Sequence, residues 1–407
     1  MFGRNFRLLK PLRQRLPALL AVIALAVGWS LSILPPAEAA ISGLKPPDTG
    51  LEVTSTGQAG GVIDTVALPV NWSDLEPTRG SFSGAGWGAI DSAIKNSNIN
   101  QLKLRIEAGK FAPSWLNSVS GSCVTVTLGH NNESGCVPRY WTSAYLNEYK
   151  GLMQEIARRY DNEPKVRVVI NAACMTINAE PFIKGGTSAG AALAKAGDSD
   201  AGEHTCMNTS MADMMAAFQH TRISVAGHVA WQIPVSGGLN NSWPEEHDIL
   251  QQWRSQYGEK FIFQDNGLST SKATCSQSSP TPANASGMWC YMKAISAPKG
   301  AQQGCGTGTG CDQINEVLAP ALKYNLCFVE HSNWNLSASQ AASYDKQLAD
   351  NCANVGSGGG GTPPPTDARP TITLTKPTDG SSVAAGTAVT IAGTARDDHT
   401  LTKVDVK

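Results

Sequence analysis

The feature that most constrains the fold is a repeated order of segments: an amphipathic stretch, a short apolar run, then polar or acidic residues. Residues 145–160 carry apolar side chains at helical spacing. The following run, Val166 to Ile170, is β-branched and continuous, which is typical of a strand buried on both faces. The chain then turns polar and reaches Glu180. A buried strand that leads to a carboxylate is typical of a (β/α)8 barrel, whose catalytic residues follow the carboxyl ends of its strands.

Further runs repeat the pattern. Two precede this unit, at 64–77 and 102–106, and the second opens into Glu107. We assign 229–235 and 260–265 as the fifth and sixth strands, and 325–330, which ends in Glu330, as the last clear one. The pattern predicts an α/β fold, a single (β/α)8 TIM barrel over residues 40–355.

The strand count leaves an alternative open. If residues 293–303 form the seventh strand, that strand ends in Gln302 and Gln303, and Glu330 lies on the eighth. Glutamine cannot attack carbon, so Glu107 or Asp265 would then be candidates for a second catalytic carboxylate.

The first 39 residues are predicted to be a signal peptide. Their basic start precedes an apolar run from Leu16 to Leu34 and the small residues Ala37-Glu38-Ala39 at a cleavage site. No later segment is apolar enough to span a bilayer. We expect a secreted bacterial protein, periplasmic or extracellular.

Ten cysteines in an exported chain predict disulfides. Because short loops close most easily, we expect near neighbours to pair. The histidines are scattered and no CxxC pair is present, so we expect no metal and no cofactor. The predicted pairs are Cys123–Cys136, Cys174–Cys206, Cys275–Cys290, Cys305–Cys311 and Cys327–Cys352.

Residues 356–370 predict a linker, since they are rich in glycine and then proline. Beyond it, residues 371–374, 388–395 and 402–406 alternate with a period of two, as short strands do. The segment RPTITLTKPTDGSSVAAGTAVTIAGTARDD resembles the opening strands of bacterial immunoglobulin-like modules. A complete sandwich of this kind needs about seven strands. Residues 371–407 therefore predict an incomplete, truncated β-sandwich module.

Several motifs in the barrel resemble a known family. The run WSDLEPTRGSF from Trp72, the later APSWL ending at Leu116, and VPRYW ending at Trp141 occur in the order seen in retaining (β/α)8 glycoside hydrolases. They are most similar to the family 42 β-galactosidase type. The resemblance covers roughly residues 64–182 and implies a glycoside hydrolase whose fourth strand ends in the acid/base glutamate.

By this resemblance Glu180 is the general acid/base, and Glu330 is the best-placed nucleophile. Retaining enzymes hold two such carboxylates about 5 Å apart. The family pattern has adjacent Asn-Glu, whereas Ala179 separates the two residues here. The candidate substrate-binding residues are Trp72, Glu76, Trp115, Asn178, Asp265 and Trp334.

Composition limits the partners. The formal net charge of −1 argues against nucleic acid, and ten tryptophans suit stacking on sugar rings. Two functions remain: a secreted glycoside hydrolase, or a non-catalytic carbohydrate-binding or surface-attachment protein on the same barrel. The interrupted Asn-Glu pair and the strand count motivate the second.

Overall fold

The chain divides into two units, residues 1–42 and 43–407, and the first lies outside the described residues together with the predicted signal peptide. In this computed structural model the described residues are 43–128, 133–177, 179–181, 183–227, 230–268, 275–282, 284–295, 298–303, 314–357, 371–376, 390 and 392–396.

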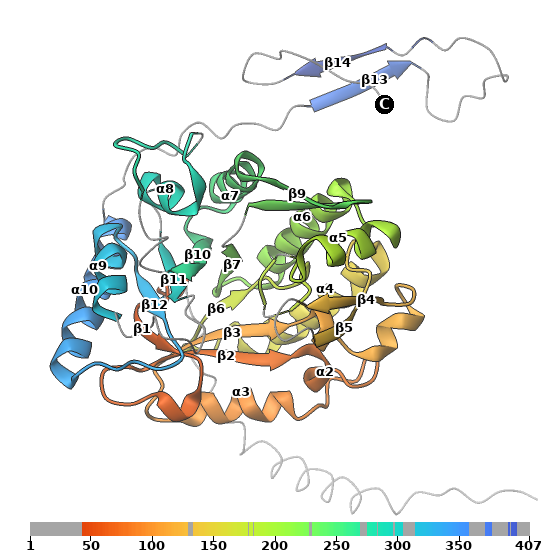
Figure 1. Ribbon diagram of the computed structural model, residues 1–407. Coiled ribbons are helices and arrows are strands. Elements are labelled where there is room, and N and C mark those ends of the chain that lie inside the picture. The colour runs from red at the N-terminus through yellow and green to blue at the C-terminus, as the bar shows by residue number, and fades with distance from the viewer. Residues whose placement is uncertain are drawn as a thin grey trace, which may run out of the picture. The chain divides into compact units, whose positions relative to one another are not determined.

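A closed barrel of parallel strands forms the centre of the described chain (Figure 1). Its strand order is β1-β12-β11-β10-β7-β6-β3-β2, and β1 pairs with both β12 and β2, so the sheet has no free edge. The predicted (β/α)8 TIM barrel is confirmed. The strands are β1 (Gly50–Val53), β2 (Thr65–Asn71), β3 (Gln101–Glu107), β6 (Val166–Ile170), β7 (Arg222–Gly227), β10 (Phe261–Leu268), β11 (Lys299–Gln303) and β12 (Phe328–Glu330).

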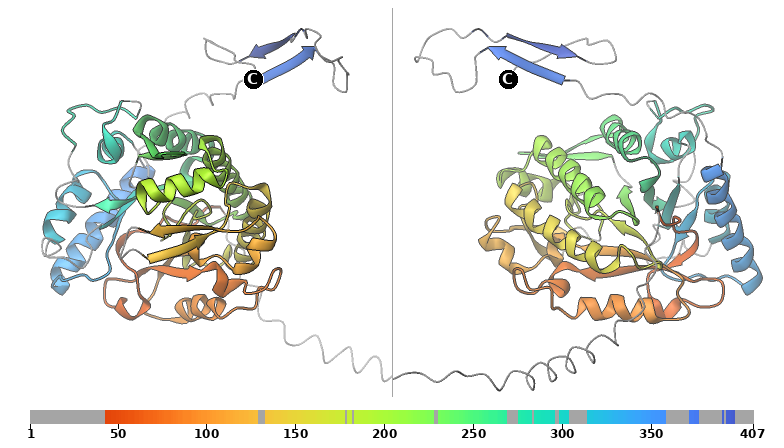
Figure 2. Two further views of the ribbon diagram at one scale, coloured as in Figure 1. Left: turned by 45° about the vertical axis from the view of Figure 1, so that its right-hand side comes forward. Right: turned by 180° about the vertical axis from the view of Figure 1, so that it is seen from behind.

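Helices surround the barrel (Figures 1 and 2). Helix α4 shows why they form: the Thr142 hydroxyl caps its first turn, and its apolar face is buried as the spacing predicted. The helices are α2 (Trp72–Leu75), α3 (Gly86–Lys95), α4 (Ser143–Tyr160), α5 (Gly186–Lys195), α6 (Asp200–Ala217), α7 (Trp243–Tyr257), α8 (Gly287–Ala294), α9 (Ile314–Lys323) and α10 (Ala338–Ser357).

The fifth strand corrects the sequence prediction. It is β7, at Arg222–Gly227, and every residue of it is buried. Most of the predicted segment 229–235 forms β8 (Trp231–Val235), which pairs antiparallel with β9 (Gly238–Ser242) outside the barrel. Three of the five residues of β8 are only half-buried. An apolar run alone does not distinguish a barrel strand from such a hairpin, because both bury side chains.

The last two strands settle the strand count. Strand β11 lies within residues 293–303 and pairs with both β10 and β12. Glu330 therefore ends the eighth strand, and Gln302 and Gln303 end the seventh. The alternative count is the one that the structure adopts.

Insertions cover the side of the barrel where the strands end. The hairpin of β4 (Val124–Leu128) and β5 (Glu133–Val137) follows β3, α5 follows β6, and β8–β9 follows β7. Helix α5 contacts β4, β8 and β9. In Figure 1 the arrows of β2 and β3 point toward these insertions.

Four of the predicted disulfides are confirmed, and Cys305–Cys311 lies outside the described residues. One of the four, Cys174–Cys206, joins the segment after β6 to helix α6. The bonds are Cys123–Cys136, Cys174–Cys206, Cys275–Cys290 and Cys327–Cys352.

Two cations on β3 occupy the barrel interior. Lys103 lies 2.6 Å from Glu52 and 2.8 Å from Asp48, with all three side chains fully buried. Its ammonium also lies 3.6 Å from the centre of the Phe328 ring, on a strand across the barrel. Two positions along β3, Arg105 reaches Glu330. Alternate residues of a strand share a face, so both cations project from the same side of β3.

In the C-terminal segment, β13 (Thr371–Lys376) pairs antiparallel with β14 (Ala392–Arg396). These strands overlap two of the three that were predicted, and the third, 402–406, lies outside the described residues. Among the described residues, no helix is both long and apolar enough to cross a bilayer.

Replacing the interior ammonium should destabilise the barrel strongly. Lys103→Met leaves Asp48 and Glu52 buried without their counter-ion, which should cost about 3–5 kcal/mol in the free energy of unfolding. Urea unfolding followed by tryptophan fluorescence measures the loss. Lys346→Met is the control, because Lys346 pairs with Asp350 at the surface and should change stability by less than about 1 kcal/mol. Equal stability of the two variants would contradict the account.

Candidate active site

Glu330 is fixed at the end of β12 by Arg105. The Arg105 Nη2 donates to Glu330 Oε2 over 2.7 Å, and Glu330 has no exposed surface. The same guanidinium nitrogen lies 3.4 Å from Gln302 Oε1, and Gln302 is the β11 residue in register with Glu330. A carboxylate with a counter-charge therefore lies inside the barrel at the carboxyl ends of its strands.

Glu180 lies in the segment after β6 and is 8% exposed. Its Oε1 accepts a hydrogen bond of 2.9 Å from Asn266 Nδ2, on β10. Gln264 Nε2 donates to Asn266 Oδ1 over 2.7 Å and lies 3.4 Å from Glu330 Oε2. Glu180 and Glu330 are thus joined through two amide side chains and lie on the same side of the barrel.

The amides of Gln264 and Asn266 were not among the predicted site residues. Their signal in the sequence is the alternation Gln264-Asp265-Asn266 at the end of a buried run, since residues two apart share a face of the strand. We predicted Asp265 instead. It is buried, its Oδ1 accepts from Gly267 N, and it lies between the two amides on the opposite face.

Close packing brings the Glu180 segment over the end of β3. A side chain at Gly109 would collide with the Thr176 carbonyl, and the positive φ of Gly109, +52°, also favours glycine. Ala179 has a φ of 50°, a left-handed conformation that costs a non-glycine residue about 1–2 kcal/mol. The residue that interrupts the Asn-Glu pair is thus held in a strained turn directly before Glu180. Asn178 lies outside the described residues.

Burial controls the charge of the carboxyls here. It raises the pKa of Glu180, and the charge of Glu330 raises it further, while the Asn266 hydrogen bond and Arg105 oppose this. Burial also raises the pKa of Glu107, the last residue of β3, with a further contribution from Glu180. Glu180 is therefore suited to hold a proton, whereas Glu330 is paired with a cation.

Two predicted substrate-binding residues lie in the core instead. Trp72 is fully buried, with its ring edge-on to Trp115, Tyr145 and Tyr149. Its Nε1 donates to Glu76 Oε2, and the other oxygen of Glu76 accepts from Gly80 N. This packing leaves Trp72 no face for a sugar, and it gives both residues a structural role.

The other two tryptophans among the predicted substrate-binding residues, Trp115 and Trp334, are partly buried. Trp115 donates from Nε1 to the Glu76 carbonyl. Trp334 donates from Nε1 to the Glu52 carbonyl near the end of β1, and its ring lies 5.3 Å from that of His331. Glu52 pairs with Glu330 in the sheet, so Trp334 lies near the predicted nucleophile.

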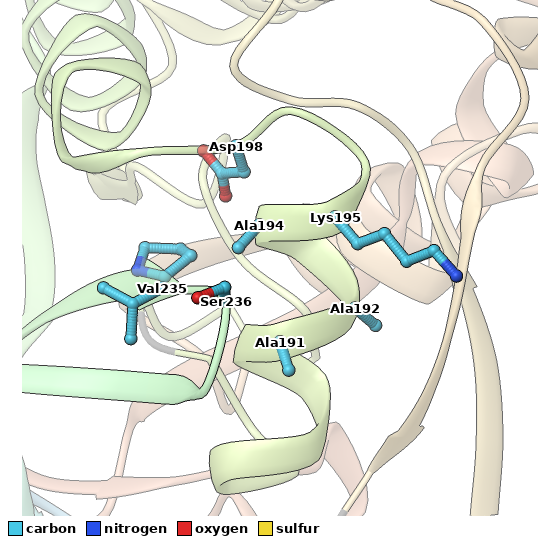
Figure 3. Close-up of a pocket in the computed structure, with 8 residues that line it drawn as sticks. Ala191, Ala192, Ala194, Lys195, Asp198, Val235 and Ser236 are labelled. Atoms are coloured by element: carbon cyan, nitrogen blue, oxygen red, sulfur yellow. The ribbon is translucent and has the colours of Figure 1, made fainter.

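An open cavity of about 680 Å³ lies elsewhere, between α5 and the turn of the β8–β9 hairpin. None of the predicted site residues lines it. Figure 3 shows alanines of α5 and Val235 around it, with the Lys195 ammonium pointing away. A metal could be held at a different place: among the described residues, the side chains of Asp200, His204 and Glu245 converge.

Removing the Cys174–Cys206 bond should loosen the segment that carries Glu180. The bond closes a loop of 32 residues, so the double variant Cys174→Ala, Cys206→Ala should lose about 3–4 kcal/mol of unfolding free energy. Denaturant unfolding measures this. The matched control is Cys123→Ala, Cys136→Ala, which opens a loop of 13 in a surface hairpin and should cost less. A larger loss in the control would contradict this account.

Glu180→Gln should stabilise the protein at neutral pH. A carboxyl with a raised folded pKa binds more protons when folded, so its contribution to stability falls as pH rises above its ordinary value of 4.5. The amide oxygen of glutamine can still accept the hydrogen bond from Asn266, and glutamine does not ionise, so the loss of stability with rising pH disappears. The gain in melting temperature should therefore grow from pH 5 to pH 8.

Glu155→Gln provides a control of opposite sign. Arg158 and Arg159 hold the pKa of Glu155 at about 2, so this carboxylate stabilises the fold above about pH 4.5. Its replacement should lower the melting temperature at neutral pH, and the loss should vanish as pH falls toward 2. The same pH trend in both variants would refute the assignment of Glu180.

Comparison with known proteins gives a family match for a short C-terminal part of the chain. A search among curated proteins gave no match. Similar solved structures include endo-glycoceramidase II from Rhodococcus sp. with a cellobiose-like imidazole. The sequence identity is 12%, the match covers 72% of this chain and 76% of that chain, and the TM-score is 0.40. An endoglucanase from Pseudomonas stutzeri has 10% identity and a TM-score of 0.40, and the match covers 76% of this chain and 98% of that chain.

A glycoside hydrolase family 36 alpha-galactosidase from Geobacillus stearothermophilus has 11% identity, a TM-score of 0.35, and coverage of 76% of this chain and 42% of that chain. These likenesses are too distant to assign an activity to this barrel. Residues 370–407, in contrast, match the bacterial Ig domain family, in agreement with the predicted module.

Proposed function

We propose that this protein is a secreted glycoside hydrolase that cleaves O-glycosidic bonds by a retaining mechanism, with Glu180 as general acid/base and Glu330 as nucleophile. The observation that carries the proposal is the connection from Glu330 through Gln264 and Asn266 to Glu180. It links two buried carboxyls at the end of the barrel where such enzymes have their chemistry.

Each carboxyl suits its step. Glu180, whose pKa is raised by burial, gives its proton to the leaving glycosidic oxygen. Glu330 attacks the anomeric carbon and forms a glycosyl ester, with Arg105 as its counter-charge. Glu180, now ionised, takes a proton from water, which attacks the anomeric carbon and releases the sugar and free Glu330.

The strand count changes the position of the nucleophile but not the chemistry. In the family that the motifs resemble, the nucleophile follows the seventh strand, where this chain has Gln302. Glu330 is in register with Gln302 on the neighbouring strand. Neighbouring strands lie about 4.8 Å apart, so the carboxylate is displaced by one strand within the same layer of the barrel. The motifs from Trp72 to Trp141 support the closer likeness to family 42.

Secretion and a carbohydrate substrate complete the proposal. The basic and apolar N-terminus and the disulfides support export, and the bacterial Ig domain match fits an extracellular enzyme. Trp334, partly exposed beside the end of β1, is the best-placed ring for stacking on a sugar. Trp115 is the second candidate.

The alternative is a carbohydrate-binding or surface-attachment protein without catalysis. One observation favours it: Glu330 has no exposed surface and is neutralised by Arg105. A nucleophile must reach the anomeric carbon, so catalysis requires Arg105 and the Glu180 segment to admit the sugar. A binding protein has no such requirement.

Turnover of aryl glycosides decides between the two functions. The parent protein should hydrolyse at least one sugar in a panel of nitrophenyl glycosides, and Glu330→Gln should reduce kcat/KM at least about 10⁴-fold, because no covalent intermediate forms. Glu180→Gln should retain more of the first step on activated substrates, whose leaving groups need no proton. Glu155→Gln, on the surface of α4, should retain parental kcat/KM.

Three outcomes contradict parts of this proposal. Normal activity in Glu330→Gln excludes Glu330 as nucleophile, and Glu107→Gln is then the next variant to test. Normal activity in Glu180→Gln on substrates with poor leaving groups excludes Glu180 as the acid. No turnover of any glycoside, together with retention on immobilised polysaccharide, supports the binding function.

A further inference from the structure

The side chains of Asp200, His204 and Glu245 converge at the ends of two helices. Asp200 and His204 lie four residues apart on α6, on one face of its first turns. Glu245 lies in the first turn of α7, 41 residues further along the chain. One oxygen from each carboxylate and one ring nitrogen of His204 all lie within 4.8 Å of one another. All three residues are partly buried.

We propose that these three residues form a binding site for a divalent transition metal, with Zn²⁺ as the preferred ion. His204 Nε2 lies 2.8 Å from Glu245 Oε1 and 3.6 Å from Asp200 Oδ1. Ligand atoms on a tetrahedral zinc ion, at bond lengths of about 2.0–2.2 Å, lie about 3.3–3.6 Å apart. The His204–Asp200 distance already matches this spacing, and a bound ion would have to move Glu245 Oε1 away from His204 Nε2 by at least about 0.5 Å.

The ring of His204 is already oriented for this role. It stacks on Trp231 of β8, with 4.4 Å between ring centres and 24° between planes. The indole Nε1 of Trp231 donates to Asp200 Oδ1 over 3.2 Å. A single side chain thus holds the imidazole and orients one carboxylate, as partners around metal ligands commonly do.

The backbone at the proposed ligands is also fixed. The Ser199 hydroxyl accepts from Gly202 N at the start of α6, and the Ser242 hydroxyl accepts from Glu245 N at the start of α7. Because both helix starts are capped, binding would cost little ordering of the chain. A metal here would clamp α6 to α7.

The donor set favours zinc over calcium or magnesium. Imidazole is a ligand for zinc and similar transition metals, whereas calcium and magnesium prefer oxygen alone. Partial exposure leaves room for water as a fourth ligand. A proton on His204 Nε2 can form a hydrogen bond to Glu245 Oε1 at 2.8 Å. The distance of 3.6 Å to Asp200 Oδ1 is too long for a hydrogen bond. A metal ion, in contrast, would bind all three side chains.

Calorimetric titration of the EDTA-treated, dialysed and tag-free protein with ZnCl₂ at pH 7.5 tests the site. We expect one zinc ion per chain with micromolar or tighter affinity, and a rise in melting temperature. His204→Gln and Glu245→Gln should each raise Kd at least tenfold and abolish the rise. Their melting temperatures without metal show whether the variants fold. CaCl₂ should bind at least tenfold more weakly than ZnCl₂.

His220→Gln is the matched control, because His220 is partly exposed and its Nδ1 faces the Gly43 carbonyl. It should bind zinc like the parent. The absence of zinc binding by the parent would refute the proposal, and so would equal binding by parent, His204→Gln and Glu245→Gln. The titration is independent of the proposed hydrolase activity.

Discussion

The ion pairs inside the barrel are the interaction on which the rest of the structure depends. Strand β3 carries Lys103 and Arg105 where a barrel core usually has branched apolar side chains. Burying either cation alone would cost several kcal/mol, so each requires a carboxylate from another strand. Lys103 takes Glu52 on β1, together with Asp48, and Arg105 takes Glu330 on β12. These pairs fix β3 against strands that are not its neighbours in the sheet.

The same constraint defines the candidate site. Arg105 holds Glu330 in a position that a carboxylate without a counter-ion could not occupy when fully buried. Glu180 reaches the same region from the segment after β6 through the strained turn at Ala179 and the hydrogen bond from Asn266. Strained backbone and buried charged groups lower the stability of the fold, and both are common at functional sites. The disulfide from Cys174 to α6 helps to hold the segment in place.

Local patterns predicted much of the fold. Helical spacing identified the buried face of α4, and the β-branched run identified β6, because both depend on neighbouring residues alone. Short loops predicted the four observed disulfides for the same reason. The prediction was wrong for the fifth strand, because burial on both faces distinguishes β7 from the hairpin strand β8, and burial depends on the rest of the molecule.

The sequence by itself determined the class of fold, the two glutamates worth testing and the C-terminal module. Only the tertiary structure decided which groups meet. It decided that Glu330 ends the eighth strand and placed Trp72 and Glu76 in the core. It also joined Glu180 to Glu330 through the amides of Gln264 and Asn266. It also brought the scattered residues Asp200, His204 and Glu245 together. The physical reason is that such contacts join residues far apart in the chain, and neither spacing nor composition records which distant segments pack against each other.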